Sequence, residues 1–340
     1  MTEIECQREP CGILTCIRAR ECDVAEALAL GRSAALNSPR TNRAIAVEGR
    51  VTESNREKLA ACFDHVIAMR PEHYRLGWQA KNVMVQYSPF HRTLFLDADC
   101  LVMRDLTPLF EMMRGKPVCF SAKPVPEQET GQSLFANVRL DTLLSYFRVD
   151  WWPQILGGGH FYFEQTATAV KVFDRARWWA RLERLIPFGW EQANISDELT
   201  LQCALVEAGL ETECAIRNLP LAMWCPNVSG RPDVLKGVVS CRRPDGSRYS
   251  TEDHSVVHFG GDHDNVYYRR ERYRLAFQAV RSGNRVALTI RSAINRPDIV
   301  GLIAYSTLRT ERLKQKLARA FHRPADTSET IGSQHSAVEC

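Results

Sequence analysis

Short apolar segments alternate with helical patterns along the first hundred residues, and this alternation restricts the possible folds more than any other feature of the sequence. The apolar segments are typical of buried strands and lie at residues 12–17, 44–47, 65–69 and 92–96. Helical spacing occurs between them, at residues 21–36, 58–62 and 78–87, and Thr52 is a plausible cap for the second of these helices. The pattern predicts an α/β fold, Rossmann-like, with a mostly parallel sheet flanked by helices. Ligands of such sheets bind beyond the carboxyl ends of the strands.

The middle of the chain is less regular. Strands are expected at residues 117–122, 160–163 and 256–259, and helices at residues 166–185 and 196–208. Polar residues with recurring Pro and Gly predict a loop at residues 123–137 and a long surface excursion at residues 226–252. The sequence therefore predicts one large domain over residues 1–290.

The last fifty residues, 291–340, differ from this domain. One helix is expected over residues 298–321, and Leu313, Leu317 and Phe321 share one of its faces. Residues 309–323 hold six Lys or Arg and one Glu, and the polar segment after Pro324 is expected to be disordered. Such a basic amphipathic helix either contacts an anionic membrane peripherally through residues 298–323 or packs, solvated, on its own domain.

Composition excludes several classes of protein. The 340 residues are 45% apolar and carry a net charge of +4, which demands no nucleic-acid partner. No apolar run is long enough for a membrane-spanning helix, and the polar first twelve residues lack a secretory signal. The twelve cysteines form no CxxC pair and are expected to be reduced. These features predict a cytoplasmic protein, with the tail as a possible contact to the inner face of the membrane.

Two carboxylates follow the strongest predicted strand. Asp97 and Asp99 are two residues apart, so in an extended chain their side chains point to one side, roughly 6–7 Å from each other. Two acidic groups at the mouth of a parallel sheet suit a hard divalent cation, and a diphosphate would supply further oxygens. Alternatively, these residues merely cap the following turn and helix, a role for which Asp105 is better placed.

Residues 87–102 (YSPFHRTLFLDADCLV) resemble the signature strand of GT-A glycosyltransferases of the glycogenin-like and lipopolysaccharide types. Three further segments match these families in the same order: 156–163 (LGGGHFYF), 196–202 (SDELTLQ) and 257–261 (VHFGG). The resemblance covers about residues 12–280. It implies the GT-A fold and metal-dependent transfer of a sugar from a nucleotide-diphosphate sugar, expected to be a UDP-sugar. The acceptor would be a carbohydrate, a lipid or a protein, and the resembled families retain the anomeric configuration.

The resemblance also implies a metal site. Asp97 and Asp99 would bind Mn²⁺ or Mg²⁺, and Asp97 would also lie near the ribose of the donor. His258 would be the third ligand through one neutral imidazole nitrogen, and nitrogen ligation favours manganese. The alternative for His258 is a hydrogen-bonded histidine at the core or edge of its strand.

Further positions match contacts to donor and acceptor. Lys81 would contact the donor, and Thr15 would lie near its base. Asp197 and Glu198 would be the catalytic pair near the reacting sugar, although Asp197 or Ser196 is equally suited to cap a helix. The glycines matched to donor contacts are Gly158, Gly159 and Gly261.

The sequence departs from these families at two places. Gly157–Gly159 replace an Asn/Ser pattern, so a side-chain contact to the sugar is missing or comes from the backbone; this segment is otherwise only a turn. After Gly261 the usual lysine-containing segment is absent, and residues 262–264 read Asp-His-Asp. Arg269 or Arg270 would have to replace that lysine.

Two rival functions remain at the level of sequence. A haloacid-dehalogenase-like phosphatase also carries a D-x-D strand, with Asp97 as its nucleophile, but its nucleophile usually lies near the N-terminus. The other rival is a catalytically inactive protein that binds sugar nucleotides.

Overall fold

The computed structural model describes residues 9–126, 138–155, 157–188, 196–216, 219, 222–224, 229–242, 254–261 and 265–281. By its internal contacts the chain divides into residues 1–290 and 291–340. The second unit, with the predicted basic helix and membrane contact, lies outside the described residues. Residues 127–137 of the predicted loop and residues 262–264 lie outside them as well.

An eight-stranded mixed sheet forms the centre of the first unit, in the order β3-β2-β1-β4-β8-β6-β7, with β9 paired to β6. Its strands are β1 (Glu9–Arg18), β2 (Asn42–Glu48), β3 (His65–Ala68), β4 (Phe90–Leu96), β6 (Val118–Pro126), β7 (Trp151–Ile155), β8 (His160–Glu164) and β9 (Ala215–Ile216). Strands β1 to β4 are parallel neighbours, whereas β8 runs antiparallel to both β4 and β6. The predicted α/β class with a mostly parallel sheet is confirmed.

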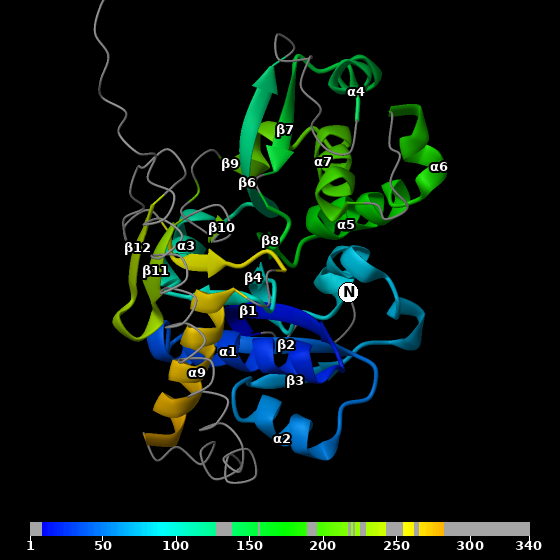
Figure 1. Cartoon of the computed structure of the whole chain (residues 1–340). Helices are drawn as coiled ribbons and strands as arrows, with labels where there is room; N and C mark the ends of the chain where they lie inside the picture. Colours follow the sequence, from blue (N-terminus) through cyan, green and yellow to red (C-terminus); the bar gives the residue numbers. More distant parts are fainter. Residues whose placement is uncertain are drawn as a thin grey trace, which may run out of the picture. The chain divides into compact units, whose positions relative to one another are not determined.

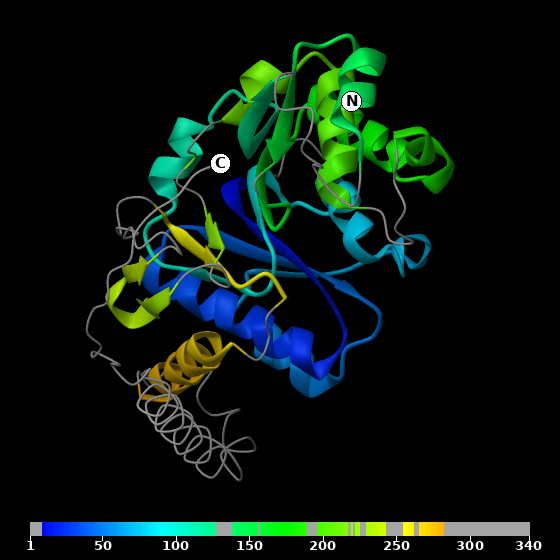
Figure 2. The ribbon, with the colours of Figure 1, turned by 45° about the horizontal axis from the view of Figure 1, so that its top comes forward.

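Helices cover both faces of this sheet (Figures 1 and 2). One face carries α1 (Glu21–Asn37), α2 (Glu53–Ala60) and α3 (Thr107–Met112), and α9 (Val266–Arg281) packs on α1. The other face carries the 3-10 helix η3 (Gly77–Gln86), α5 (Ala167–Trp179) and α7 (Asp197–Glu207). The shorter helices are α4 (Leu140–Phe147), α6 (Leu182–Leu185), α8 (Glu211–Cys214), η2 (Pro71–His73), η5 (Ile186–Phe188) and η7 (Val234–Lys236).

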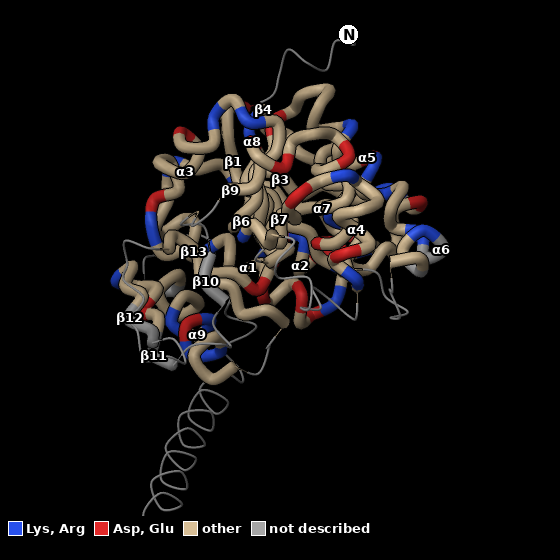
Figure 3. The backbone as a smooth tube through the Cα atoms, turned by 90° about the horizontal axis from the view of Figure 1, so that it is seen from above, with Lys and Arg blue, Asp and Glu red and all other residues tan. Residues whose placement is uncertain are grey.

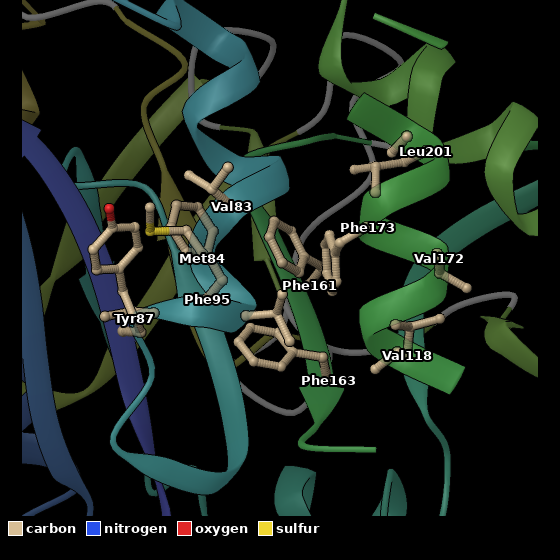
Figure 4. Packing of buried hydrophobic residues seen from close by; sticks show 14 of the residues in the cluster. Val83, Met84, Tyr87, Phe95, Val118, Phe161, Phe163, Val172, Phe173 and Leu201 are labelled. Carbon is tan, nitrogen blue, oxygen red and sulfur yellow. The ribbon is translucent and has the colours of Figure 1, made fainter. Parts of the chain in front are cut away.

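Alternating strand residues build the two cores. On the face covered by η3 and α5, the rings of Phe95 and Phe161 stack with centroids 4.8 Å apart, and Phe173 lies 5.6 Å from Phe161 (Figure 4). Val83 and Met84 of η3 belong to the same buried cluster. Burying each such side chain contributes about 1.5–3 kcal/mol. This packing holds the ends of β4 and β8 side by side.

A second, three-stranded sheet brings a distant segment to the end of β4. It contains β5 (Cys100–Val102), β10 (Ala222–Trp224) and β13 (Val256–His258), in the order β10-β13-β5. β13 runs antiparallel to β5, and its register sets His258 opposite Cys100. A histidine late in the chain is thereby placed directly beside the two aspartates.

The sequence predictions fail at three places. The helix expected over residues 78–87 is the 3-10 helix η3, in which Ala80 and Val83, at the three-residue spacing of such helices, are both buried. β6 continues to Pro126, into the expected loop, because it pairs with the unpredicted strand β7. The helix expected over residues 166–185 ends at Trp179, and α6 follows separately.

Within the expected surface excursion the structure has a hairpin of β11 (Ser229–Asp233) and β12 (Val238–Arg242). The 3-10 helix η7 and Gly237 join its two strands, and Gly237 has a φ of +62°, a conformation that favours glycine. The predicted cap at Thr52 is confirmed, because its side chain accepts a hydrogen bond from the Asn55 N–H.

Charges of both signs are spread over the described elements, with arginines concentrated on α9 (Figure 3). Two of these, Arg270 and Arg274, are engaged by Glu271, which is fully buried. Among the described helices, none combines the length and apolar character needed to cross a membrane.

Candidate active site

The two aspartates lie in a tight turn between β4 and β5. The Asp97 N–H donates to the Gly159 carbonyl at 2.7 Å, which extends the pairing of β4 with β8 by one residue. The Cys100 N–H donates to the Asp97 carbonyl at 3.0 Å and closes the turn. The chain therefore passes directly from one sheet to the other at this point.

Asp99 lies between His258 and the backbone of Gly261. Its Oδ1 atom is 3.3 Å from Nε2 of His258, and its Oδ2 atom accepts a 2.6 Å hydrogen bond from the Gly261 N–H. Burial acts to raise the pKa of Asp99, but these contacts outweigh it and hold the pKa below its usual range. Burial acts to lower the pKa of His258, but Asp99 and Asp97 outweigh it, so that this pKa is raised.

Lys81 of η3 bridges two carboxylates. Its Nζ atom is 3.0 Å from Oδ2 of Asp97 and 2.9 Å from Oδ2 of Asp197, and its side chain is only 12% exposed. Burial alone would lower the pKa of Lys81, but the two carboxylates outweigh it and raise the pKa. Burial raises the pKa of Asp97, and Lys81 and His258 offset this in part. Lys81 therefore ties β4 to the start of α7.

Two glycines let these side chains reach the backbone of the segment before β8. A Cβ atom on Gly159 would lie 2.3 Å from Cε1 of His258 and 2.8 Å from Oδ2 of Asp97. A Cβ atom on Gly158 would lie 2.6 Å from Oδ2 of Asp197. The predicted glycine segment is thus in direct contact with the predicted ionisable residues.

Replacing Gly159 with alanine is expected to separate His258 from Asp97, because the added methyl group occupies their present positions. Overpacking of this kind costs about 1–3 kcal/mol of unfolding free energy, measurable by urea denaturation. Gly209→Ala is the control for the added methyl group: its φ of +65° brings backbone strain of its own, but open space surrounds its Cβ position, so no side chain is displaced. We expect Mn²⁺ affinity to fall only in the Gly159 variant, and equal affinity in both variants would contradict this contact.

Glu198 occupies the first turn of α7 beside Asp197. Ser196 caps this helix by accepting a hydrogen bond from the Glu198 N–H at 3.2 Å, so the capping role predicted for either Ser196 or Asp197 belongs to Ser196. The Glu198 Oε1 atom accepts a 2.5 Å hydrogen bond from the Gly158 N–H. Burial, with a smaller contribution from Asp197, raises the pKa of Glu198 to about 7. The carboxyl group can therefore change its charge near neutral pH.

Glu198 is expected to make folding stability depend on pH. Its pKa is about 7 in the folded protein against 4.5 for the free group, so between these values the folded state binds more protons than the unfolded state. Stability is therefore lost as the pH rises through 7. Urea unfolding at pH 5 and pH 8 should show the wild type losing about 1–3 kcal/mol relative to Glu198→Gln. An identical pH dependence of the two proteins would contradict the raised pKa.

The donor atoms suit a divalent cation. Ligand atoms of Asp99, Cys100 and His258 lie within 4.8 Å of one another, and Oδ2 of Asp97 is 3.6 Å from Nε2 of His258. Burial raises the pKa of the Cys100 thiol well above its usual value, and Cys100 belongs to an apolar cluster. Carboxylate oxygens and one imidazole nitrogen are therefore the better donors.

The capping alternative for the two aspartates is met by another residue. Asp105 accepts hydrogen bonds from the Thr107 N–H at 3.1 Å and from the Thr107 hydroxyl at 2.9 Å, at the start of α3. Asp97 and Asp99 make no such contact with that helix in the described part of the chain. They face Lys81 and His258 instead.

Thr15 and Cys16, near the carboxyl end of β1, lie on opposite faces of the sheet. Thr15 shares its strand face with Ile13 and Ile17, which pack toward α1, and its buried hydroxyl has no hydrogen-bond partner in the part of the chain that the structure describes. Cys16 points to the other face, where burial and the nearby charge of Asp97 raise the pKa of its thiol to about 12. Because side chains alternate between the two faces of a strand, Cys16 shares its face with the apolar Leu14. This alternation could have placed Cys16 from the sequence.

A second residue missed from the sequence is His160, the first residue of β8. Its ring lies edge-on to that of His258, with centroids 6.2 Å apart. Burial, followed by the charges of His258 and Lys81, lowers the pKa of His160 to about 3.

Of the two arginines considered as replacements for the missing lysine, Arg270 bonds to Glu271 and to the Pro232 carbonyl.

Comparisons with known proteins bear on this arrangement. No family model matches the sequence, and none of the curated proteins matches it. Among solved structures, an active-site mutant of LgtC superposes with a TM-score of 0.50 at 17% identity, over 78% of this chain and 95% of that one. The chain has the GT-A glycosyltransferase fold.

Two other GT-A structures give lower scores. LgtC, described as a galactosyltransferase in complex with donor and acceptor sugar analogues, has a TM-score of 0.49 at 16% identity, over 78% of this chain and 95% of that one. WbbM, described as a bifunctional glycosyltransferase, has a TM-score of 0.48 at 11% identity, over 83% of this chain and 51% of that one. The fold is inferred from the LgtC mutant, and at 17% identity that likeness shows the fold alone.

Proposed function

We propose that the chain is a metal-dependent glycosyltransferase, of the hexosyltransferase type. It transfers a sugar from a nucleotide-diphosphate sugar, a UDP-sugar in the first instance, to a carbohydrate, lipid or protein acceptor. The anomeric configuration is retained, as in the families that the sequence resembles. The observation that carries the proposal is the contact of Asp99 with His258 at the mouth of a GT-A sheet.

The charge of the site supports a bound cation. Four carboxyl groups face one lysine and one histidine; these residues are Asp97, Asp99, Asp197, Glu198, Lys81 and His258. An anionic diphosphate would be repelled from such a site without added positive charge. Asp97, Asp99 and His258 would hold Mn²⁺ or Mg²⁺, and the imidazole donor favours Mn²⁺. The bound cation supplies electrostatic stabilisation of the leaving diphosphate.

The other residues have separable tasks. Lys81 is fixed between Asp97 and Asp197, where its ammonium group faces the same space as the cation ligands. Asp197 and Glu198 would be the carboxyl groups near the anomeric carbon as it develops oxocarbenium character. The Gly158 N–H holds the Glu198 carboxyl group in place. The backbone of Gly158 and Gly159 would lie beneath the donor sugar.

The rival functions are weakened to different degrees. A haloacid-dehalogenase-like phosphatase has no support from the fold, which is that of GT-A glycosyltransferases. An inactive protein that binds sugar nucleotides shares the fold and would share the cation site. Only turnover separates it from an enzyme.

The decisive experiment measures the release of UDP from a panel of UDP-hexoses, with and without Mn²⁺. The proposal expects slow hydrolysis of at least one donor that requires Mn²⁺ and stops when EDTA is added. Mn²⁺-dependent UDP binding without turnover of any donor or acceptor tested would favour the inactive protein. Turnover that resists EDTA would contradict metal dependence.

A further inference from the structure

His160 is a buried polar side chain whose ring nitrogens find no hydrogen-bond partner among the described residues. The residue is 3% exposed, and within that part of the chain neither Nδ1 nor Nε2 is hydrogen-bonded. Buried polar atoms without partners are rare in folded proteins, and each requires an explanation. The residue lies at the start of β8, where its backbone pairs with Leu96, the residue before Asp97.

The polar edge of this ring faces a glycine. A Cβ atom on Gly157 would lie 3.1 Å from Cε1 of His160, 3.7 Å from Nδ1 and 4.0 Å from Nε2. Cε1 is the carbon between the two ring nitrogens, so the edge that carries both of them points toward the Cβ position of Gly157. Gly157 is half-buried and has a φ of +126°, which disfavours any other residue.

The absence of a side chain at Gly157 and the orientation of the His160 ring are therefore linked. Any side chain at position 157 would lie against the edge of the His160 ring that carries its nitrogens, and glycine leaves that position open with respect to the described residues. The next residues, Gly158 and Gly159, contact Glu198, Asp197, Asp97 and His258. The space in front of His160 therefore adjoins the segment on which the proposed donor sugar rests.

We propose that His160 is a specificity-determining residue that binds a hydroxyl group of the donor sugar across Gly157. A neutral imidazole offers one donor and one acceptor, and a sugar hydroxyl offers the same pair, so the two groups are complementary. The inference rests on the proposed function, because the hydroxyl belongs to the sugar of a nucleotide-diphosphate sugar. The His160 side chain would take the place of the Asn or Ser contact to the sugar that Gly157–Gly159 lack.

The test compares binding of UDP, UDP-glucose, UDP-galactose and their monodeoxy analogues by calorimetry with Mn²⁺ present. His160→Phe keeps a ring but removes both nitrogens, and is expected to weaken the preferred UDP-hexose on the order of 10-fold. UDP itself should bind equally to both proteins. One deoxy analogue should bind wild type as weakly as the parent UDP-hexose binds His160→Phe. The same analogue and the parent UDP-hexose should bind His160→Phe with equal affinity.

His160→Asn keeps a donor near the position of Nδ1 and should recover part of the lost affinity, which guards against a folding defect in the phenylalanine variant. Tyr162→Phe is the matched control: it lies on the same strand, and its hydroxyl bonds to Glu164. It should leave all the affinities unchanged. If His160→Phe lowers the affinity for UDP and for UDP-hexose equally, the inference is overturned. It is also overturned if removing each hydroxyl lowers the affinity of wild type and of the variant by the same factor. If wild type binds no UDP with Mn²⁺, the proposed function itself fails.

Discussion

Asp99→Asn is expected to lower Mn²⁺-dependent UDP release on the order of 10²- to 10³-fold. The substitution keeps the shape of the side chain but removes the charge that faces Nε2 of His258 at 3.3 Å. A neutral amide is a weak ligand for a hard cation, so the apparent affinity for Mn²⁺ should fall with the rate. Steady-state UDP release over a range of Mn²⁺ concentrations measures both effects.

The control for this variant is Asp64→Asn, the same substitution at a carboxylate that is 41% exposed and paired with Arg43. An exposed pair of this kind contributes about 0–1 kcal/mol, so activity and Mn²⁺ dependence should be unchanged. Wild-type turnover in Asp99→Asn would contradict the role assigned to Asp99. An equal loss in both variants would mean that the assay reports on folding.

Lys81→Met is expected to cost about 3–5 kcal/mol of unfolding free energy. The substitution keeps the length of the side chain but leaves Asp97 and Asp197 without their shared cation, and the Asp197 side chain is only 9% exposed. An unpaired buried carboxylate must either stay charged in a poor environment or take up a proton. Urea denaturation at pH 7 measures the loss.

A second substitution separates charge from packing at this site. Adding Asp197→Asn to Lys81→Met removes one of the two unpaired charges, so the double variant should be more stable than the sum of the single effects predicts. Lys58→Met, in a lysine that hydrogen-bonds only to Asn55 among the described partners, should change stability little. A loss below about 1 kcal/mol in Lys81→Met, or strict additivity, would contradict the bridge.

The sequence predicts those site residues whose position follows from the pattern of their own segment. Period-two alternation and a long apolar run place Asp97 and Asp99 at the end of β4, and the fold class follows from the order of strands and helices. Lys81, Asp197 and His258 were assigned only through resemblance. In the structure Lys81 lies 3.0 Å from Asp97 and 2.9 Å from Asp197, and His258 lies 3.6 Å from Asp97.

The remainder depends on pairings between distant segments. β5 has three residues, too few for a periodic signal, yet its register with β13 sets His258 beside Cys100. The expected loop over residues 123–137 overlaps β6 because β7, a strand with no alternating pattern, pairs with it. Neighbouring residues of a strand point to opposite faces, so Cys16 lies near the charge of Asp97 whereas Thr15 shares the face of Ile13 and Ile17. His160 was missed because its lack of partners appears only after packing.

Asp97, Asp99 and His258 are proposed to hold a divalent cation for a nucleotide diphosphate. Pulsed electron paramagnetic resonance of Mn²⁺ bound with UDP tests it directly, since a coordinated imidazole nitrogen modulates the signal of the ion. We expect this nitrogen signal in wild type and its loss in His258→Leu. Bound Mn²⁺ with no nitrogen signal in wild type, or an unchanged signal in the variant, would contradict it.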